Sequence, residues 1–164
     1  MGRDTVTART PDDVDEVSRA VLTASRMLAA ISARSLSHVE ERVTLPQFRM
    51  LVLLSTQGPS KLVALADLLG TAPSSTMRMV DRLISTGLAL RETNPDNRRE
   101  TLLRLTDDGQ RTVEDVTRRR RHEITAIVQK MASEQRATLV QALNIFNQAG
   151  GEPLIAHLDE TLNP

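Results

Sequence analysis

Two short amphipathic segments, separated by only three residues, constrain the fold of this chain more than any other feature. Leucines recur at helical spacing over residues 62–69, with Ser60 placed as an N-cap and Gly70 just past the end. Pro73, whose fixed φ and missing N–H suit the first turn of a helix, opens the second segment. Because helices joined this tightly cross at a large angle, the sequence predicts a helix-turn-helix.

The second segment divides into an inward and an outward face. The inward positions recur at helical spacing and are Thr76, Met79, Val80, Leu83 and Ile84. The outward positions are small and polar near the N-terminus and include two arginines; they are Ser74, Ser75, Met77, Arg78, Asp81, Arg82 and Ser85. A helix that enters the major groove needs short side chains near its tip, donors for base edges, and an N-terminus that favours phosphate. The alternative is an ordinary solvated helix face.

Two runs of alternating residues follow Gly87 and flank a polar loop, TNPDNRRE, over residues 93–100. Leu88 and Leu90 before the loop, and Leu103 and Leu105 after it, alternate with Ala89, Arg91, Leu102 and Arg104, as in the two strands of a hairpin. The loop carries the turn residues Asn94, Pro95 and Asp96, which favour a protruding turn.

Two arginines, Arg98 and Arg99, lie near the tip of this loop. A guanidinium placed there reaches phosphates or enters the minor groove. Together with the helix pair in front of it, the hairpin predicts a winged helix-turn-helix. The alternative is a solvated hairpin whose arginines pair with Asp96 and Glu100.

The run DNRRETLLRLT, over residues 96–106, resembles the D-x-R…L-T wing signature of MarR-type transcriptional regulators. VDRLISTGLALR, just before it, resembles the end of their recognition helix and their first wing strand. The resemblance covers essentially the whole chain. It implies a homodimer that binds palindromic double-stranded operator DNA as a regulator, more often a repressor, and that often releases it when a small molecule binds or a cysteine is oxidised.

The resemblance also assigns roles to individual residues. Arg98 takes the place of the wing arginine, and Asp96 that of the acid that orients it. The positions expected to contact DNA on the helix and the wing are Ser74, Ser75, Met77, Arg78, Arg82, Asp96, Arg98 and Arg99. The resemblance further implies an apolar effector pocket between the dimer helices and the DNA-binding lobe.

The segments outside the predicted winged helix favour a mainly α (α+β) chain, 1–164, organised as one domain. A long helix is expected from Asp12, where apolar residues three and four apart form a near-heptad stripe that needs a partner helix. A shorter buried helix starts at Leu45-Pro46 and ends before Gly58. A helix capped by Thr106 runs to about Met131.

A further helix is expected from Ser133 to about Gln148, and the tail 153–162 still carries an apolar stripe. The apolar surfaces at the two ends of the chain have no role in a winged helix. We therefore predict that 12–44 and 107–162 form a dimerisation region with two-fold symmetry, and that 45–106 forms the DNA-binding lobe.

Composition removes several classes of protein. With 164 residues, 40% of them hydrophobic, the chain suits one ordinary domain with its own core. The polar N-terminus and the lack of a long apolar run predict no signal peptide and no membrane span, so we expect a cytoplasmic protein. The absence of cysteine from this chain excludes disulfides, thiolate metal sites and a cysteine-based redox switch.

The net charge is zero, which argues against indiscriminate binding to polyanions, but the charges are unevenly distributed. Residues 74–104 carry six arginines against four acidic residues, whereas residues 122–164 carry two basic against five acidic residues. The run Arg118 to Arg121 is interpreted as a solvated stem that pairs with Glu114 and Asp115 four residues before it, not as a nucleic-acid patch.

Catalytic chemistry finds little support in the sequence, so we expect no enzyme, no cofactor and no metal site. His38, His122 and His157 lie on different predicted elements without ligand spacing, and no phosphate loop or nucleophile motif is present. The main alternative to a DNA-binding regulator is a winged helix that serves only as a protein-interaction module.

Overall fold

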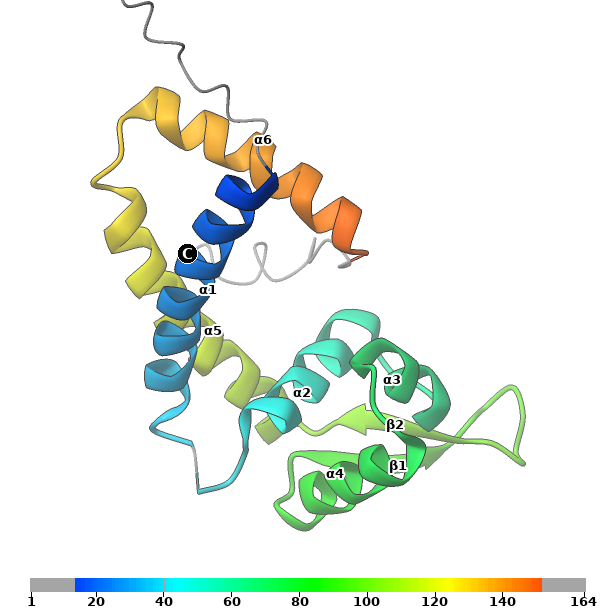
Figure 1. The fold of residues 1–164 in the computed structure, drawn as a ribbon. Helices are drawn as coiled ribbons and strands as arrows, with labels where there is room; N and C mark the ends of the chain where they lie inside the picture. Colours follow the sequence, from blue (N-terminus) through cyan, green and yellow to red (C-terminus); the bar gives the residue numbers. More distant parts are fainter. Residues whose placement is uncertain (1–13, 40, 152–164) are drawn as a thin grey trace, which may run out of the picture.

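The computed structural model describes residues 14–39 and 41–151. In this part of the chain the elements follow in the order α1 (Val14–Leu36), α2 (Leu45–Gln57), α3 (Leu62–Leu69), α4 (Pro73–Ser85), β1 (Ala89–Thr93), β2 (Thr101–Leu105), α5 (Asp107–Val128) and α6 (Ser133–Gly150). The molecule has two parts (Figure 1): a winged lobe made of α2, α3, α4 and the β1–β2 hairpin, and a helical frame made of α1, α5 and α6. The mainly helical winged-helix fold predicted from the sequence is confirmed.

The winged lobe has a closed apolar core. Phe48 and Leu51 of α2, Leu65 of α3, and Val80 and Leu83 of α4 are all at most 2% exposed. The two residues named in α2, and the two named in α4, are three positions apart, so each of these helices turns one side inward. The inward and outward faces predicted for the second helix of the helix-turn-helix therefore agree with the burial along α4.

The turn between α3 and α4 is held by local hydrogen bonds. Gly70 adopts the left-handed conformation with φ 62°, as predicted, and Thr71 N–H donates to Ala66 O at 3.0 Å. The Thr71 and Thr76 hydroxyl groups lie 2.8 Å apart, and Thr76 is fully buried. These contacts fix the angle at which α4 leaves the turn.

Ser60 does not cap α3, contrary to the sequence prediction. The N-cap residue is Lys61, while Ser60 forms a β-bridge with Leu103 of β2 through N–H···O bonds of 2.9 and 2.8 Å. The backbone of Ser60 is therefore used to extend the sheet, which ties the start of α3 to the hairpin.

The hairpin is antiparallel, with Ala89 opposite Leu105 and Arg91 opposite Leu103. Directly opposed residues share one face of a sheet, so Ala89 and Arg91 lie on the face of the buried leucines. The predicted alternation was wrong for β1: Leu90 is half-buried on the other face, opposite Arg104. The reason is that Leu88 fills the core before the strand begins, with its N–H bonded to Leu83 O.

Gly109 brings the first turn of α5 into direct contact with the hairpin. A Cβ atom added at this position would lie 2.0 Å from the carbonyl oxygen of Leu88. Thr106, the predicted N-cap, accepts a hydrogen bond from Gly109 N–H at 3.0 Å, and its own hydroxyl donates to Gly87 O at 2.6 Å. The start of α5 is thus packed backbone against backbone on the start of β1.

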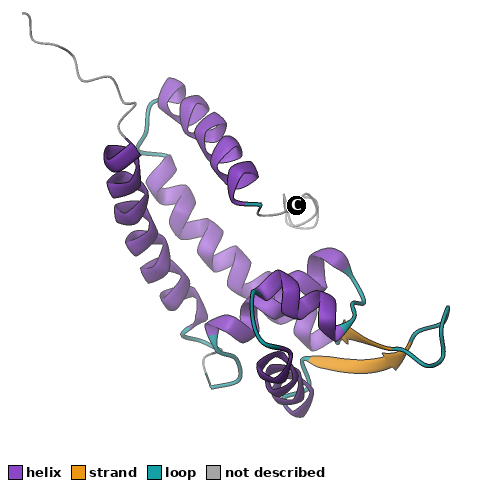
Figure 2. Cartoon of the chain, turned by 45° about the vertical axis from the view of Figure 1, so that its right-hand side comes forward, coloured by secondary structure: helices purple, strands orange, loops and turns teal. Residues whose placement is uncertain are grey.

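The helical frame shares the core of the lobe through Leu36 of α1 and Val113 and Val116 of α5, but much of its remaining apolar surface is exposed. α1 lies along α5, where Arg34 Nε donates to Glu123 Oε2 at 2.9 Å. The predicted α1 stripe is exposed over most of its length, with Val17 49% and Leu28 44% exposed, and only its end at Ile31 is buried. α6 lies far from α4 in both views (Figures 1 and 2) and contains no buried residue.

Two sequence predictions fall on residues that the structure does not describe. They are the start of the first helix at Asp12 and the apolar stripe in the tail 153–162. Within the described residues, α5 ends at Val128, slightly earlier than expected, and α6 begins at Ser133 as predicted.

Candidate nucleic-acid interface

The outward face of α4 is the largest predicted group of DNA-contacting residues. Ser74, Met77, Arg78 and Arg82 are exposed, whereas Ser75 is half-buried. The N-cap residue, Ala72, makes no side-chain cap hydrogen bond, and its carbonyl oxygen accepts from the N–H groups of Ser75 and Thr76 at 3.0 Å. Because Pro73 has no N–H, the Ser74 N–H is the donor that the first turn of α4 leaves for an anion. The face combines short polar side chains at its tip with two guanidinium groups further along.

The loop between β1 and β2 protrudes beyond the helices of the winged lobe (Figure 2). Asn94 closes it: its N–H donates to Glu100 O at 2.9 Å, and its side-chain oxygen accepts from Asp96 N–H at 3.0 Å. At the tip, Arg99 N–H donates to the side-chain oxygen of Asn97 at 3.2 Å. The loop is therefore shaped by backbone and amide contacts that leave the guanidinium groups uninvolved.

Arg98 and Arg99 are both exposed, and no ion pair involving either is found within residues 41–151. The expected role of Asp96 is not seen, because the described hydrogen bonds and ion pairs include none between Asp96 and Arg98. The backbone N–H of Asp96 is instead bound by Asn94. Both wing arginines consequently point their charge at solvent, where a phosphate can meet it.

Glu100 is committed to holding the base of the wing and does not pair with the wing arginines. The Lys61 ammonium lies 2.8 Å from its carboxylate, and the Asn94 amide donates to it at 3.0 Å. Hydrogen bonding from Lys61 and then from Asn94 lowers the pKa of the Glu100 carboxyl. The solvated-hairpin alternative, with the arginines paired to Asp96 and Glu100, therefore does not describe this loop.

A second ion pair, which the sequence did not suggest, connects the hairpin to α4. Arg91 Nη2 lies 2.7 Å from Asp81 Oδ1 and 3.5 Å from the sulfur of Met77. The strand register reveals this contact, since it places Arg91 of β1 opposite Leu103, and β1 is the strand that packs against α4.

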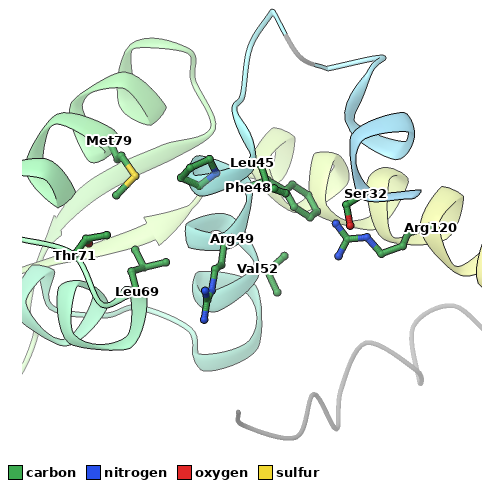
Figure 3. Close-up of a pocket in the computed structure, with 10 residues that line it drawn as sticks. Ser32, Leu45, Phe48, Arg49, Val52, Leu69, Thr71, Met79 and Arg120 are labelled. Atoms are coloured by element: carbon green, nitrogen blue, oxygen red, sulfur yellow. The ribbon is translucent and has the colours of Figure 1, made fainter. Parts of the chain in front are cut away.

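A pocket of about 550 Å³ lies where the helical frame meets the winged lobe. Figure 3 shows Ser32 and Arg120 on one side of it and Leu69, Thr71 and Met79 on the other. Its remaining lining residues come from α2 and are Leu45, Pro46, Phe48, Arg49 and Val52. The pocket thus touches α1, α2, α3, α4 and α5, and its walls are mostly apolar.

Arg120 is the one member of the arginine run that the sequence interpretation placed wrongly. Its guanidinium carbon lies 5.7 Å from the centre of the Phe48 ring, and its Nε atom is buried without a hydrogen-bond partner among the described residues. Burial lowers the pKa of this guanidinium from its ordinary value. A charged group of this kind at the wall of an apolar pocket suits an anionic ligand.

The rest of the run behaves as a stem, although with different partners from those predicted. Arg118 pairs with Asp115 three residues before it, and Glu114 accepts a hydrogen bond from Gln110 at 2.9 Å. No group of three or more metal-ligating side chains occurs within the described residues. None of the helices described is both long and apolar enough to cross a membrane.

Comparison with known proteins places this geometry in a family. Residues 43–101 match the MarR family model, which spans the winged lobe almost completely. The crystal structure of RV1404 from Mycobacterium tuberculosis is 51% identical, covers 88% of this chain and 98% of that one, and superposes with a TM-score of 0.78.

More distant proteins share the fold. A MarR family protein from Bacillus stearothermophilus is 22% identical, with 84% of this chain and 95% of that chain covered and a TM-score of 0.78. The uncharacterized HTH-type transcriptional regulator YfiV of Bacillus subtilis (strain 168) is 22% identical over 107 residues, which are 65% of this chain and 67% of the relative. The exposed α4 face, the wing arginines and these similarities lead to one conclusion: the chain belongs to the MarR family of winged-helix, DNA-binding transcription regulators.

Proposed function

We propose that the protein acts in the cytoplasm as a homodimeric repressor that binds a palindromic operator. The observation that carries the proposal is the joint exposure of the α4 face and of Arg98 and Arg99, with no ion pair to the wing arginines among the described residues. A mutant of Staphylococcus aureus MepR, 16% identical with a TM-score of 0.58, was solved bound to an oligodeoxyribonucleotide. We infer that α4 enters the major groove and that the wing meets the adjacent minor groove or backbone.

The dimer is inferred from the apolar surface that a single chain leaves exposed. Ile145 and Phe146 of α6 are 69% and 53% exposed, and Val17 and Leu28 of the α1 stripe are 49% and 44% exposed. Monomeric proteins rarely expose apolar area of this extent. A two-fold interface through the frame would set the spacing of two α4 helices, which is what a palindromic site requires.

The helix and the wing are expected to contribute differently to binding. Arg78, near the N-terminal end of α4, has a guanidinium suited to the O6 and N7 atoms of guanine in the major groove. Arg98 is expected to meet the DNA backbone or the minor groove, where different base pairs present similar hydrogen-bond acceptors. Arg78→Ala should therefore cost about 1–3 kcal/mol on the preferred duplex and much less on others. Arg98→Ala should weaken binding to every duplex and lower the salt dependence by about one phosphate contact.

The test is a binding titration of the full chain against a duplex selected by the wild type and against a scrambled duplex, at two salt concentrations. Arg136→Ala, which removes a charge from α6, is the matched control and should change neither affinity. If Arg98→Ala removed the sequence preference while Arg78→Ala lowered every affinity equally, the assigned roles would be reversed. Negligible affinity of the wild type for any duplex would favour the protein-interaction module instead.

The pocket between the frame and the lobe is the place where we expect an effector to act. Its apolar walls and the Arg120 guanidinium suit a small molecule with an apolar body and a carboxylate. Bordetella bronchiseptica BpsR, 22% identical with a TM-score of 0.63, has its DNA binding regulated by 6-hydroxynicotinic acid. A ligand here would touch α1, α4 and α5 together, and so would couple the dimer helices to the recognition helix.

The effector role can be tested with 6-hydroxynicotinate, benzoate and neutral benzamide added to the DNA complex. We expect the two carboxylates, and not benzamide, to release DNA, and Arg120→Gln to abolish the release. Arg119→Gln, which changes the exposed neighbour, is the control and should respond like the wild type. Equal release by benzamide, or an unchanged response of Arg120→Gln, would place the effector elsewhere.

A further inference from the structure

Asp81 stands in an unfavourable position for a DNA-binding face. It lies one helical turn after Met77 and Arg78 on the outward side of α4, and its side chain is 57% exposed. A carboxylate there faces the phosphates that the proposed docking would bring close, and like charges repel. Simple electrostatics therefore predicts that removing this charge tightens the binding of DNA.

The contacts of Asp81 indicate a different role. Its Oδ1 atom accepts a hydrogen bond from Arg91 Nη2 at 2.7 Å, and the same guanidinium group lies 3.5 Å from the Met77 sulfur. Arg91 belongs to β1, opposite Leu103, on the hairpin face that packs against α4. One guanidinium thus contacts two successive turns of the recognition helix from the base of the wing.

The opposite edge of the hairpin is anchored to the other helix of the pair. Ser60 bridges to Leu103, and the Lys61 ammonium lies 2.8 Å from the Glu100 carboxylate. With β2 tied to the start of α3, the Arg91–Asp81 contact ties β1 to α4. The direction in which the wing leaves the lobe is therefore set by both helices of the helix-turn-helix.

We propose that Asp81 and Arg91 form a positioning pair, which holds the wing at the angle that lets α4 and the wing arginines engage one duplex at the same time. The inference rests on the proposed DNA-binding function and adds two residues to it that touch no base themselves. If the wing already has this angle in the free protein, less conformational entropy is lost when the protein binds its preferred duplex. Because exposed ion pairs contribute modestly, the expected effect on the preferred duplex is about fivefold.

The experiment uses the full chain with Asp81→Asn, Arg91→Gln and the double variant, titrated with a duplex selected from a random pool by the wild type and with a scrambled duplex. Asp81→Asn should bind the selected duplex about fivefold more weakly, although it removes a negative charge, and should bind the scrambled duplex as well as the wild type or better. The double variant should show the same ratio of affinities for the selected and the scrambled duplex as Arg91→Gln alone. Arg91→Lys, which keeps the charge, should restore part of the preference.

The hairpin supplies a matched control. Arg104 Nε pairs with Glu92 Oε2 at 3.0 Å on the opposite face, with comparable exposure and no part in the contact with α4. Arg104→Gln removes the same charge from the same hairpin and should leave the ratio of the two affinities unchanged. Equal thermal midpoints for all variants would show that the fold is intact.

Three results would overturn the proposal. Tighter binding of Asp81→Asn to both duplexes would mean that Asp81 only repels phosphate. Additive losses in the double variant, with a changed preference at one base pair, would mean that Asp81 reads a base directly. A wild-type chain that enriches no duplex would overturn the proposed function and the positioning pair together, whereas the first two results reject the pair alone.

Discussion

The winged lobe and the helical frame are both built from amphipathic helices, yet they treat their apolar stripes in opposite ways. α2 buries five residues, Phe48, Met50, Leu51, Leu53 and Leu54, within a single chain, whereas α6, which is longer, buries none. The same helical spacing of apolar residues therefore predicts a helix in both parts. It does not show whether the apolar face packs against the same chain or against a second one. The lobe is complete in one chain, and the frame is the part that we expect a second copy to complete.

The largest expected effect lies in the lobe and tests whether its core depends on assembly. Leu51 is fully buried, so Leu51→Ala should destabilise the protein by about 2–5 kcal/mol through lost burial and the cavity left behind. Chemical denaturation at several protein concentrations measures this cost. A cost that varied strongly with concentration would contradict the view that the lobe packs independently.

A smaller effect is expected in the frame, and it should appear as a change of assembly. Leu143 of α6 is 47% exposed in the single chain, and burying that remaining part against a partner would contribute about 1 kcal/mol per chain. Leu143→Glu should therefore shift the protein toward the chain mass in light scattering at micromolar concentration.

Val63→Glu is the matched control for that experiment. Val63 is 63% exposed but belongs to α3 in the lobe, so its replacement should leave the mass of the assembly unchanged. If both variants, or neither, changed the mass, the separation of lobe and frame proposed here would not hold.

The smallest effect concerns acid stability at the junction of the two parts. Arg42, between α1 and α2, pairs with Asp108 in the first turn of α5, and this hydrogen bond lowers the pKa of the Asp108 carboxyl. A depressed folded-state pKa contributes stability above the unfolded pKa and loses it as the pH falls through the folded pKa. Because the pair is about half exposed, the contribution is below about 1 kcal/mol.

Thermal melts of the wild type and Asp108→Asn between neutral pH and pH 3 would measure this contribution. The wild type should melt higher at neutral pH, and the difference should shrink below about pH 4 as Asp108 is protonated. A difference that stayed constant down to pH 3 would show that the carboxylate charge does not contribute.

Much of the lobe could be predicted from the sequence because its signals are local. The left-handed Gly70, the N-cap at Thr106 and the division of α4 into two faces each depend on residues close in the chain, and the structure agrees with all three. The wing arginines at the loop tip were also found in this way, since the turn residues around them favour a protruding loop.

The features that the sequence did not reveal depend on contacts between distant segments. The register of the hairpin decides that Arg91 faces α4, and a shift of one residue would turn it to the other side. Arg120 points at the pocket because Phe48 of α2 lies beneath it, and a run of four arginines gives no sign of which one turns inward. The sequence predicts a helix cap at Ser60, because the pairing of its backbone with Leu103 of β2 leaves no local pattern.

The close packing of Gly109 on Leu88 makes the junction between α5 and the hairpin mechanically stiff. Where side chains separate two elements, a small shift of one is absorbed by changes of rotamer in between. Here the backbone of the helix meets the carbonyl group of Leu88, just before β1, with no room for a Cβ atom, so nothing between them can be compressed. Any displacement of the first turn of α5 would therefore be passed to Leu88 and the start of the hairpin, because no side chain between them could absorb it.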